Sequence, residues 1–324
     1  MSSLRAGVLG VGHLGAAHAQ LLSQNPGFTL VGIHDRDAER ASLVATGIGA
    51  RAYTDPQTLL ENIDAAVIAV PTGAHYEIGR MALEAECHVL LEKPLATNLT
   101  EANELVRLAE EEGRVLAVGH VERFNGLLLA LEDRLEQPRF IESLRMAPFQ
   151  SRGTDVTVIL DLMIHDIDLV LALAKSPLAD VHAVGVPVLS PSIDIANARL
   201  VFESGTVANI TASRVSIKPL RRLRLFQDNG YFSLNLATGV GEHYRRRDAR
   251  NIQEIKGIES VVERLPVRAV KGEPLARELD AFAEAILGNP SRLVLGPAGR
   301  DALAIAIRIT SKIEESTNVL TQDS

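Results

Sequence analysis

The chain has 324 residues, which exceeds the length over which one hydrophobic core usually extends, so we expect two domains. Hydrophobic residues make up 46% of the sequence, as in ordinary globular proteins. The 41 acidic residues outnumber the 33 Lys and Arg, and the net charge of −8 argues against nucleic acid as a partner.

A single cysteine, Cys87, lies in an apolar run, where we expect a buried structural thiol. One cysteine allows neither an internal disulfide nor a cysteine metal cluster, which fits a reducing compartment. The first residues lead directly into an apolar strand pattern and leave no room for a signal peptide, and no apolar run approaches membrane-spanning length. We therefore expect a cytoplasmic protein without a membrane partner.

The most informative motif lies close to the N-terminus. A short apolar run leads directly into Gly10-x-Gly12-x-x-Gly15. The periodicity that follows predicts a helix over 16–22, and a second apolar run predicts a strand that ends just before Asp35. Strand, glycine turn, helix, strand and acid in this order are typical of a dinucleotide-binding βαβ unit.

Each glycine of this motif has a physical role. Gly10 permits the tight turn, Gly12 lets a pyrophosphate approach the backbone, and Gly15 lets the helix pack closely against the sheet. The helix N-terminus offers N–H groups and a partial positive charge to the phosphates. We expect His13 and Leu14, which lie between the glycines, to contact the cofactor as well.

Asp35 bears on the choice of cofactor. Its carboxylate would accept hydrogen bonds from the adenine ribose hydroxyls and repel a 2′-phosphate, so NAD is favoured. Arg36 follows at once and could accommodate that phosphate, so NADP stays the less favoured alternative. The spacing of Asp35 also argues against a glycine-rich turn in an ordinary βαβ unit.

Strand and helix patterns continue to alternate up to about residue 120. A continuous apolar run at 65–70 is typical of a strand buried on both faces, and Thr100 is a good N-cap for a helix. Repeated βα units predict a doubly wound parallel sheet in a first domain over residues 1–120. The other elements expected here are helices at 38–46, 56–60, 74–86 and 100–113 and strands at 50–53, 88–91 and 114–118.

Glu92-Lys93-Pro94 directly follows one of these predicted strands. Ligands of doubly wound folds lie beyond the carboxyl ends of the strands, so Lys93 is placed where a nicotinamide and a substrate would meet. An ammonium there can hydrogen-bond a substrate hydroxyl and stabilise the alkoxide as hydride leaves. Pro94 restricts the backbone of Lys93, and a cis bond would aim it sharply. A surface lysine in a loop is the alternative.

The stretch VGHVERFNG at 118–126 follows the last strand of the first domain. It contains His120, Arg123 and Asn125 at the expected domain junction. Arg123 and Arg152 are candidates for contact with an anion, because a guanidinium binds phosphate through two hydrogen bonds. Structural salt bridges are the alternative, and the sequence leaves both open.

The pattern changes after residue 120. Short strand patterns follow one another from 181 to about 265, with the clearest hairpin signals at Ser204-Gly205 and Asn229-Gly230. We therefore expect a second domain over 121–324 of the α+β class. Its sheet would be mostly antiparallel with helices on one face and an open face that favours oligomers, and its terminal helices could pack back on the first domain. The other elements expected here are helices at 123–137, 156–175, 274–288 and 297–315 and a strand at 139–147.

The predicted helix at 156–175 carries polar residues in an apolar stretch. Asp161 and His165 are four residues apart and share one helical face, which Asp168 extends. A histidine that titrates near neutral pH can take a hydroxyl proton as hydride departs, with Asp161 orienting the imidazole or contacting the substrate. A satisfied core histidine is one alternative. A metal site of these three residues is another, which we disfavour because Lys93 already supplies the positive charge.

Together, GVGHLG, Glu92-Lys93-Pro94 and Asp161-x-x-x-His165 resemble the Gfo/Idh/MocA oxidoreductases over nearly the whole chain. The resemblance implies a Rossmann domain followed by an open-faced antiparallel sheet. It also implies tightly bound NAD(H) or NADP(H) and hydride transfer at a sugar or polyol carbon. Lys93 would match the lysine of the family's EKP motif, and Asp161 and His165 would match its acid and base pair.

Further residues fit the family's cofactor-binding pattern. Pro71, His75 and Glu92 match it and would lie at the cofactor. Gly73 stands where the family often has an asparagine, which changes the side chain available to the cofactor there.

Two segments, VGHVERFN and RGTDVTVILDLMIHDIDLVL, look like those of family members that oxidise the 3-hydroxyl of UDP-N-acetylglucosamine. This likeness implies that Arg123, Asn125 and Arg152 contact the substrate, with the arginines suited to a diphosphate. The complete set of expected substrate contacts is Lys93, His120, Arg123, Asn125, Arg152, Asp161 and His165.

The sequence thus predicts an NAD-dependent dehydrogenase that acts on a secondary hydroxyl of a sugar, above all of a UDP-linked amino sugar. A dehydrogenase or reductase for free sugars or inositols is the alternative within this class. A non-catalytic NAD-binding sensor is the alternative outside it, although a sensor would not need Lys93, Asp161 and His165 together. We expect a homo-oligomer, a dimer or a tetramer, and no bound metal.

Overall fold

The computed structural model describes residues 3–131, 134–149, 156–247, 257 and 261–322. The chain divides into two compact units, the first of Met1–Phe124 with Gly272–Leu303 and the second of Asn125–Lys271 with Ala304–Ser324. Residues 272–303 were predicted in the second domain, whose terminal helices could pack back on the first. Among the described residues, no helix is both long and apolar enough to span a membrane.

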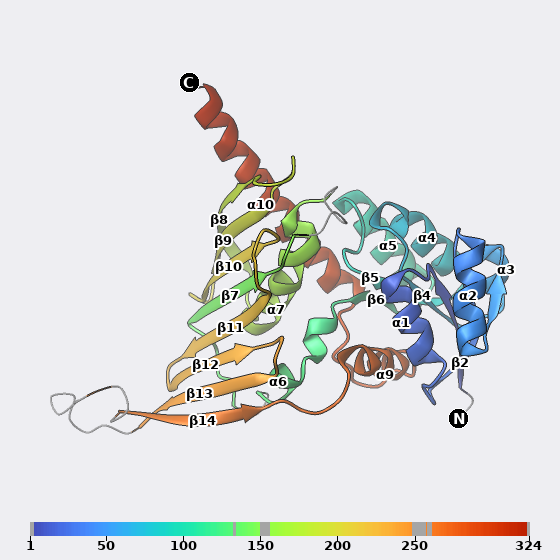
Figure 1. Ribbon diagram of the computed structural model, residues 1–324, viewed down its shortest axis with the longest axis horizontal. Coiled ribbons are helices and arrows are strands. Elements are labelled where there is room, and N and C mark those ends of the chain that lie inside the picture. The colour runs from blue at the N-terminus through green and yellow to red at the C-terminus, as the bar shows by residue number, and fades with distance from the viewer. Residues whose placement is uncertain (1–2, 132–133, 150–155, 248–256, 258–260, 323–324) are drawn as a thin grey trace. The chain divides into compact units, whose positions relative to one another are not determined.

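The first unit has a parallel sheet as its centre (Figure 1). Its described strands are β1 (Leu4–Leu9), β2 (Phe28–His34), β3 (Arg51–Tyr53), β4 (Ala65–Ile68), β5 (His88–Glu92) and β6 (Leu116–Gly119). They pair in the order β3-β2-β1-β4-β5-β6, and every pairing is parallel. This confirms the predicted doubly wound sheet, whose strand order reverses between β1 and β4, where such folds bind ligands.

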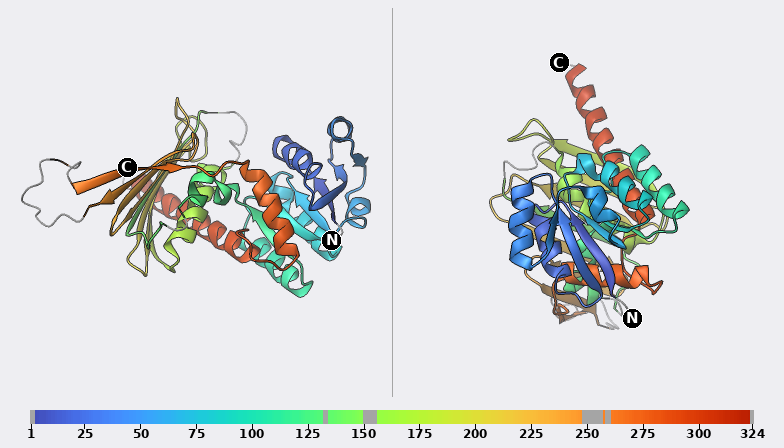
Figure 2. Two further views of the ribbon diagram at one scale, coloured as in Figure 1. Left: turned by 90° about the horizontal axis from the view of Figure 1, so that it is seen from below. Right: turned by 90° about the vertical axis from the view of Figure 1, so that its right-hand side faces the viewer.

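Helices lie on both faces of this sheet (Figure 2). The described ones are α1 (His13–Leu22), α2 (Ala38–Ile48), α3 (Pro56–Leu60), η1 (Thr72–Ala74), α4 (His75–Glu84), α5 (Leu99–Glu111), η2 (Val121–Phe124) and α9 (Pro274–Ile286), together with the first part of α10 (Gly296–Gln322).

The predicted N-cap of α5 was wrong. Asn98 caps the helix, because its backbone is extended and its side chain accepts a hydrogen bond from the Glu101 N–H at 3.0 Å. Thr100, the predicted cap, lies inside the helix. Thr97 strengthens the N-terminus, since its backbone N–H and its hydroxyl both donate to the Glu101 carboxylate.

The place of α9 in the first unit follows from what it buries. Leu279 and Phe282 are fully buried in the core formed by β1, β2 and α1. The Phe282 ring stacks on Phe28 of β2 with 6.1 Å between the ring centroids. Apolar burial of this kind, and not closeness in sequence, assigns the segment to the first unit.

The second unit is built on a separate sheet with one bare face (Figure 1). Its described strands are β7 (Phe140–Met146), β8 (Leu178–Val186), β9 (Ile195–Phe202), β10 (Val207–Ser213), β11 (Leu220–Gln227), β12 (Gly230–Asn235), β13 (Val240–Arg246) and β14 (Val262–Arg268). They pair in the order β14-β13-β12-β11-β7-β10-β9-β8, and among these pairs only β10 and β7 are parallel. The predicted α+β class with a mostly antiparallel sheet is confirmed.

Both predicted hairpin turns lie between paired strands. Gly205 connects β9 to β10 with φ +82°, and Gly230 begins β12 with φ +145°. These are backbone conformations that glycine adopts without strain. A Cβ on Gly230 would also lie 2.1 Å from the Tyr244 carbonyl oxygen, so the strand pairing itself requires glycine there.

The helix predicted at 123–137 was wrong. Short η2 is followed by α6 (Gly126–Leu129), and the Asn125 backbone between them is not helical. A Cβ on Gly126 would lie 2.3 Å from the Val270 carbonyl oxygen, so this segment turns where the chain returns past it. The predicted helix at 156–175 is present as a π-helical turn, η3 (Ile159–Met163), which continues as α7 (Ile164–Ala174).

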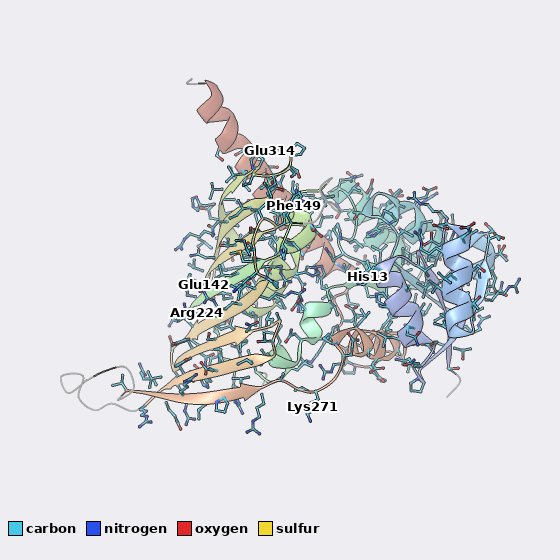
Figure 3. The ribbon with its side chains drawn as sticks, viewed as in Figure 1. His13, Glu142, Phe149, Arg224, Lys271 and Glu314 are labelled. Atoms are coloured by element: carbon cyan, nitrogen blue, oxygen red, sulfur yellow. The ribbon has the colours of Figure 1, made fainter. Side chains whose placement is uncertain are left out.

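The two faces of the second sheet differ in character. Residues such as Ile141 and Leu225 are buried on the face toward α7, whereas Glu142 and Arg224 lie on the other face (Figure 3). On this open face the rings of Phe140, Phe226, Tyr231 and Tyr244 form a continuous row, with 5.6, 5.1 and 4.6 Å between successive centroids. The Arg224 guanidinium lies over two of these rings, and Arg224 also pairs with Glu142 at 3.3 Å.

A buried charge organises the loop between β8 and β9. The Asp194 carboxylate is fully buried and accepts hydrogen bonds from three successive backbone N–H groups, those of 188–190, and from the Ser190 hydroxyl. It also pairs with Arg214 at 2.8 Å, and this guanidinium donates to the Val156 carbonyl just before η3. Burial acts to raise the pKa of Asp194, but the bonds from Ser190 and Arg214 outweigh it and hold the pKa well below its usual range.

We expect Asp194→Asn to lower the free energy of unfolding by about 3–5 kcal/mol, because it removes one charge of a buried ion pair, the carboxylate 2.8 Å from the Arg214 guanidinium. Urea denaturation at neutral pH measures this. Because the pKa of Asp194 is lower in the folded protein, its contribution is complete above the ordinary aspartate pKa of about 3.9 and is lost as the pH falls below that value. The difference between wild type and variant should therefore shrink in acid.

Ser190→Ala provides the comparison, since it removes one hydrogen bond to the same carboxylate and should cost only about 1 kcal/mol. Equal losses for the two substitutions would contradict the role assigned to the charge.

Candidate functional site

The glycine turn combines close packing with an open space. A Cβ on Gly15 would lie 1.8 Å from the Gly10 carbonyl oxygen, and Gly10 itself has φ +84°. Nothing lies within 4 Å of a Cβ built on Gly12, which stands at the N-cap of α1 and makes no side-chain cap. His13 begins the helix and, like Leu14, is exposed (Figure 3). Free N–H groups beside an empty Cβ position suit a pyrophosphate, so the residues present fit a dinucleotide.

Asp35 lies at the end of β2, next to the glycine turn. Its carboxylate is buried and accepts hydrogen bonds from the N–H groups of Val11 and Asp37 at 2.8 and 2.9 Å. Arg40 of α2 donates to both of its oxygens, at 2.7 and 3.2 Å. Burial acts to raise the pKa of Asp35, but these bonds outweigh it and lower the pKa.

Arg40 is a residue that the sequence analysis missed. Arg36, the predicted neighbour of Asp35, is exposed, whereas Arg40 reaches back from the first turn of α2. The available signal was its position three residues after Asp37, which caps α2 through the Arg40 N–H. That cap places the first turn of the helix over the end of β2.

The Glu92-Lys93-Pro94 turn lies at the end of β5, and the bond between Lys93 and Pro94 is cis. Glu92 is buried, and one of its oxygens lies 2.9 Å from His18 Nε2 of α1. The Lys93 N–H donates to the other oxygen at 3.3 Å, and the Lys93 side chain is half-buried. Burial acts to raise the pKa of Glu92, but His18 and Lys93 outweigh it and lower the pKa, so the carboxylate is ionised at neutral pH.

His75 begins α4 and is buried in contact with the same turn. Its ring nitrogens lie 2.7 Å from the Pro94 carbonyl oxygen and 2.9 Å from that of Val70. Pro71 directly precedes the short η1 helix and is exposed. His75 and Glu92, both predicted at the cofactor, thus contact other groups of the protein, and His18 is a further residue that the sequence analysis missed.

The polar face of the predicted catalytic helix lies in the second unit. Asp161 is in η3 and His165 in the first turn of α7, and both side chains are half-buried. Asp168 is almost fully buried. Within the described residues, no three His, Cys, Asp or Glu side chains form a group that could hold a metal ion.

A buried ion pair next to His165 joins this helix to the sheet. Asp166 is paired with Arg145 of β7 at 2.6 Å and accepts a hydrogen bond from the Ser143 hydroxyl at 2.7 Å. All three residues are buried. A π-helical turn immediately before such a contact is typical of functional sites, because it changes the direction of neighbouring side chains.

The predicted residues of 118–126 differ in their surroundings. His120 is buried and Arg123 half-buried, both in the first unit. Asn125 belongs to the second unit, where its side chain donates to the Leu236 carbonyl oxygen at 3.0 Å and accepts from the Leu127 N–H at 3.1 Å. These two hydrogen bonds of the Asn125 side chain therefore stabilise the local backbone. Arg152 lies outside the described residues.

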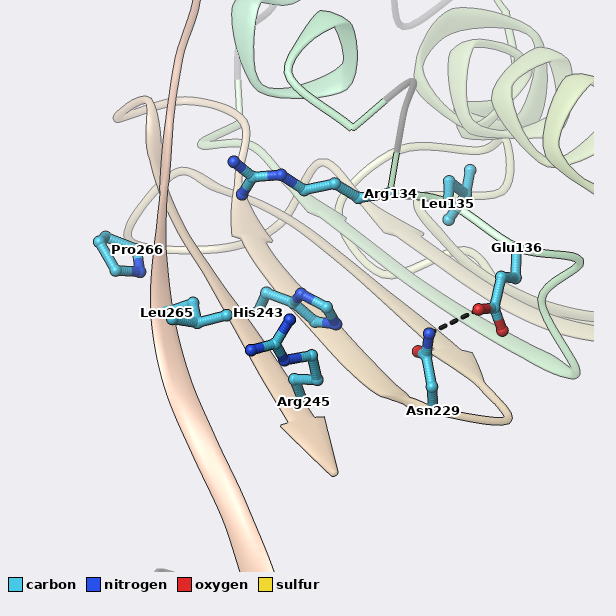
Figure 4. Close-up of a pocket in the computed structure, with 8 residues that line it drawn as sticks. All are labelled: Arg134, Leu135, Glu136, Asn229, His243, Arg245, Leu265 and Pro266. Carbon is cyan, nitrogen blue, oxygen red and sulfur yellow. Dashed lines mark hydrogen bonds between the residues drawn. The ribbon is translucent and has the colours of Figure 1, made fainter. Parts of the chain in front are cut away.

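A cavity of about 540 Å³ lies in the second unit beside β13 (Figure 4). His243 at its wall stacks on Phe232 with 4.0 Å between the ring centroids. Burial and the charges of Arg245 and Arg134 lower the pKa of His243. The described residues that line the cavity include none of the predicted site residues; they are Arg134, Leu135, Glu136, Asn229, His243, Arg245, Leu265 and Pro266.

In the first unit, then, the structure brings several predicted groups to one edge of the sheet. The glycine turn follows β1, Asp35 follows β2 and the Lys93 turn follows β5, and the carboxyl ends of parallel strands meet at the same edge. This edge is the candidate cofactor site.

Comparison with known proteins agrees with this geometry. Residues 4–120 match the model of an oxidoreductase family described as an NAD-binding Rossmann fold, and residues 134–233 match the Gfo/Idh/MocA C-terminal domain. The chain is 38% identical over 318 residues to UDP-N-acetylglucosamine 3-dehydrogenase of Acidithiobacillus ferrooxidans, covering 97% of this chain and 98% of that protein. The chain belongs to the Gfo/Idh/MocA family of oxidoreductases. The resemblance drawn from the sequence motifs is thereby confirmed.

Other known proteins are similar in sequence or in fold. A solved structure of the A. ferrooxidans enzyme has a TM-score of 0.88 at 37% identity and covers 97% of this chain and 99% of that chain. Inositol 2-dehydrogenase of Mycolicibacterium smegmatis is 32% identical over 193 residues, 56% of each chain. The scyllo-inositol dehydrogenase of Lactobacillus casei, solved with NAD(H) and scyllo-inositol, shares the fold at 19% identity with a TM-score of 0.78, over 97% of this chain and 98% of that chain. The first unit is therefore a nicotinamide-dinucleotide-binding domain.

The two glycines around the N-terminus of α1 allow a matched test. We expect Gly12→Ala to leave the melting temperature nearly unchanged, because its methyl group meets open space, but to weaken dinucleotide binding about 10-fold or more by blocking the pyrophosphate. Gly15→Ala should instead lower the melting temperature markedly, because its methyl group meets the Gly10 carbonyl. Calorimetry and titration with NADH measure both. A Gly12→Ala variant with unchanged affinity would contradict this cofactor site.

Proposed function

We propose that the protein is an NAD-dependent dehydrogenase that oxidises a secondary hydroxyl of a sugar, above all the 3-hydroxyl of UDP-N-acetylglucosamine. The observation that carries the proposal is the position of Lys93, at the same sheet edge as the glycine turn and Asp35. The nucleotide-sugar substrate is supported by the 38% identity to UDP-N-acetylglucosamine 3-dehydrogenase over almost the whole chain.

Each residue has a defined role in this proposal. The N-terminus of α1 binds the pyrophosphate, and Asp35 binds the adenine ribose. NAD, when bound, supplies the hydride acceptor. Lys93 hydrogen-bonds the reacting hydroxyl and stabilises negative charge on its oxygen. His165 takes the hydroxyl proton, and Asp161 orients the imidazole or contacts the sugar.

NAD is favoured over NADP because an ionised, buried carboxylate stands at the end of β2. Substrate contacts from His120, Arg123 and Arg152 remain part of the proposal, with the arginines binding the diphosphate. Asn125 belongs to the proposed set of substrate contacts as well. The proposal needs no metal, since Lys93 would supply the positive charge at the oxygen.

Replacement of Lys93 tests the catalytic role. Lys93→Met removes the ammonium but keeps an apolar stem of similar length, so we expect kcat with UDP-N-acetylglucosamine and NAD to fall by about 10²–10⁴-fold. NADH affinity, measured by fluorescence titration, should change little. The appearance of NADH absorbance reports turnover, and full activity of the variant would overturn the assignment.

Substrate comparison separates the alternatives in the same assay. Turnover of UDP-N-acetylglucosamine well above that of N-acetylglucosamine and inositol supports the nucleotide-sugar proposal. Preference for a free sugar or inositol supports the alternative dehydrogenase. A sensor binds NADH yet turns over none of the three.

We further propose that a second copy of the chain covers the open face of the second sheet, giving a dimer or a tetramer. Support comes from the composition of that face, on which four aromatic rings and Arg224 lie in a row. Aromatic residues and arginine are enriched in protein interfaces.

Tyr231→Glu tests this surface. A carboxylate in the middle of the aromatic row would have to be buried in the interface, so we expect loss of at least about 2 kcal/mol of association energy and a shift toward monomers. Light scattering after size exclusion measures the molar mass. The matched control is Leu43→Glu on α2, where the side chain is 77% exposed. Unchanged molar mass in the Tyr231 variant would contradict the proposal.

A further inference from the structure

We propose that His18 and His75 are positioning residues for Lys93, which they hold by fixing the Glu92-Lys93-Pro94 turn from two sides. The inference rests on the proposed catalytic role of Lys93. Neither histidine is assigned to the reaction itself, because each acts through another residue of the turn.

The first contact comes from α1. The His18 ring is fully buried, and its Nε2 lies 2.9 Å from a Glu92 oxygen. Among the described residues, no hydrogen-bond partner is found for its Nδ1. An ionised carboxylate only accepts hydrogen bonds. The hydrogen of the His18 ring is therefore on Nε2, which donates a hydrogen bond to Glu92. Burial of a polar ring is costly unless the ring is hydrogen-bonded, and Glu92 provides that hydrogen bond. We therefore infer that His18 holds the Glu92 carboxylate in place.

Glu92 transmits this contact to Lys93. Its second oxygen accepts the Lys93 backbone N–H at 3.3 Å. On its other side the carboxylate is packed against Gly119 of β6, where an added Cβ would lie 3.0 Å from the Glu92 carboxyl carbon. The carboxylate thus has a fixed position between α1, β6 and the turn. A carboxylate held in this way fixes the backbone from which the Lys93 side chain extends.

The second contact comes from the start of α4. His75 spans the Pro94 and Val70 carbonyl oxygens, at 2.7 and 2.9 Å, and is 1% exposed. Burial lowers the pKa of His75, although both carbonyls and the charge of Glu92 act to raise it, so the ring is neutral at neutral pH and donates through one nitrogen. The Pro94 carbonyl oxygen is the nearer of the two, at 2.7 Å, and a hydrogen bond to it ties the residue after Lys93 to the start of α4.

These contacts matter because catalysis depends steeply on the position of a reacting group. A misplacement of about 1 Å can lower turnover by about 10²-fold without any loss of the group itself. His18 also lies one and a half turns after the N-terminus of α1, the helix proposed to bind the pyrophosphate. The same helix therefore sets the position of the cofactor and, through Glu92, that of Lys93.

Two pairs of substitutions test the proposal. His18→Leu and His75→Leu remove the polar contacts, whereas His18→Gln and His75→Gln keep an N–H donor. We expect the leucine variants to lower kcat by about 10²-fold with the KM for NAD changed by less than about threefold, and the glutamine variants to recover at least about 10-fold of the lost kcat.

His88→Leu is the matched control. His88 is half-buried at the opposite end of β5, where its Nδ1 accepts the Val115 N–H at 3.0 Å. Its loss should lower the melting temperature but leave kcat within about twofold of wild type. Circular dichroism confirms that each variant is folded, and Glu92→Gln serves as a second probe of the same contact should His18→Leu fail to fold.

A second measurement needs neither cofactor nor substrate. The rate at which an acylating reagent modifies the Lys93 amine, followed by mass spectrometry of the cofactor-free protein, reports how firmly the side chain is held. Lys175, Lys218 and Lys271 serve as internal standards. We expect His18→Leu and His75→Leu to change the modification rate of Lys93, relative to the three standard lysines, by at least about threefold. His18→Gln, His75→Gln and His88→Leu should change it less.

The outcomes are distinguishable. Wild-type kcat and an unchanged Lys93 modification rate in His18→Leu and His75→Leu overturn the positioning role, whatever the substrate. A fully active Lys93→Met variant overturns the proposed function instead, while the modification rates still decide whether the histidines hold the turn. The positioning role is also contradicted if His18→Gln and His75→Gln do not restore kcat and if the loss of kcat parallels the fall in melting temperature.

Discussion

The close packing of α1 against the end of β1 is the constraint on which the site of the first unit depends. Only hydrogen on the α-carbon of Gly15 allows the helix to begin this near the Gly10 carbonyl oxygen. That approach leaves the helix N-terminus open at Gly12 and also carries His18 onto Glu92. We infer that a backbone contact near the N-terminus sets both the proposed phosphate site and the position of a lysine that follows a different strand.

The second unit places its polar helix by a different kind of contact. Apolar burial alone would allow α7 to slide or rotate on the sheet, because apolar contacts have little direction. The Arg145–Asp166 pair, with Ser143, has defined geometry and lies in the interior next to His165. A buried ion pair is weak evidence for stability, but one with its hydrogen bonds satisfied specifies a single arrangement of the elements that it joins.

Much of the fold could be predicted from periodicity. The apolar runs around Val8 and Val67 and the glycine motif indicated a doubly wound sheet, since strands buried on both faces read as continuous apolar segments. Local errors arose where two signals competed. Thr100 and Asn98 are both good caps, and the extended backbone of Asn98 decided between them. The apolar stretch after Arg123 looked helical, but the Asn125 backbone is not helical and Gly126 makes a close backbone contact, so only the short α6 forms there.

The candidate site was less predictable because its contacts join distant positions. His18 and Glu92 are 74 residues apart, and neither residue type at its own position indicates the other. The π-helical turn before His165 has no sequence signal that we recognise. Sequence motifs indicated residues that we propose to contact cofactor or substrate, whereas the contacts that hold the Lys93 turn became visible only through the packing of α1 and α4 around β5.

The ion pair between Asp35 and Arg40 affects the choice between NAD and NADP. A lone carboxylate at the end of β2 would repel a 2′-phosphate through its full charge. Here the guanidinium of Arg40 bridges both carboxylate oxygens, so the net charge at that point is close to zero. Each oxygen also accepts a backbone N–H, so a ribose hydroxyl that binds Asp35 would take the place of one of the Arg40 contacts. Preference for NAD would then arise mainly from hydrogen bonds that the ribose makes, and only weakly from repulsion of a phosphate. Removal of Asp35 would at the same time release Arg40, a cation suited to that phosphate, so one position controls both the attraction of one cofactor and the exclusion of the other.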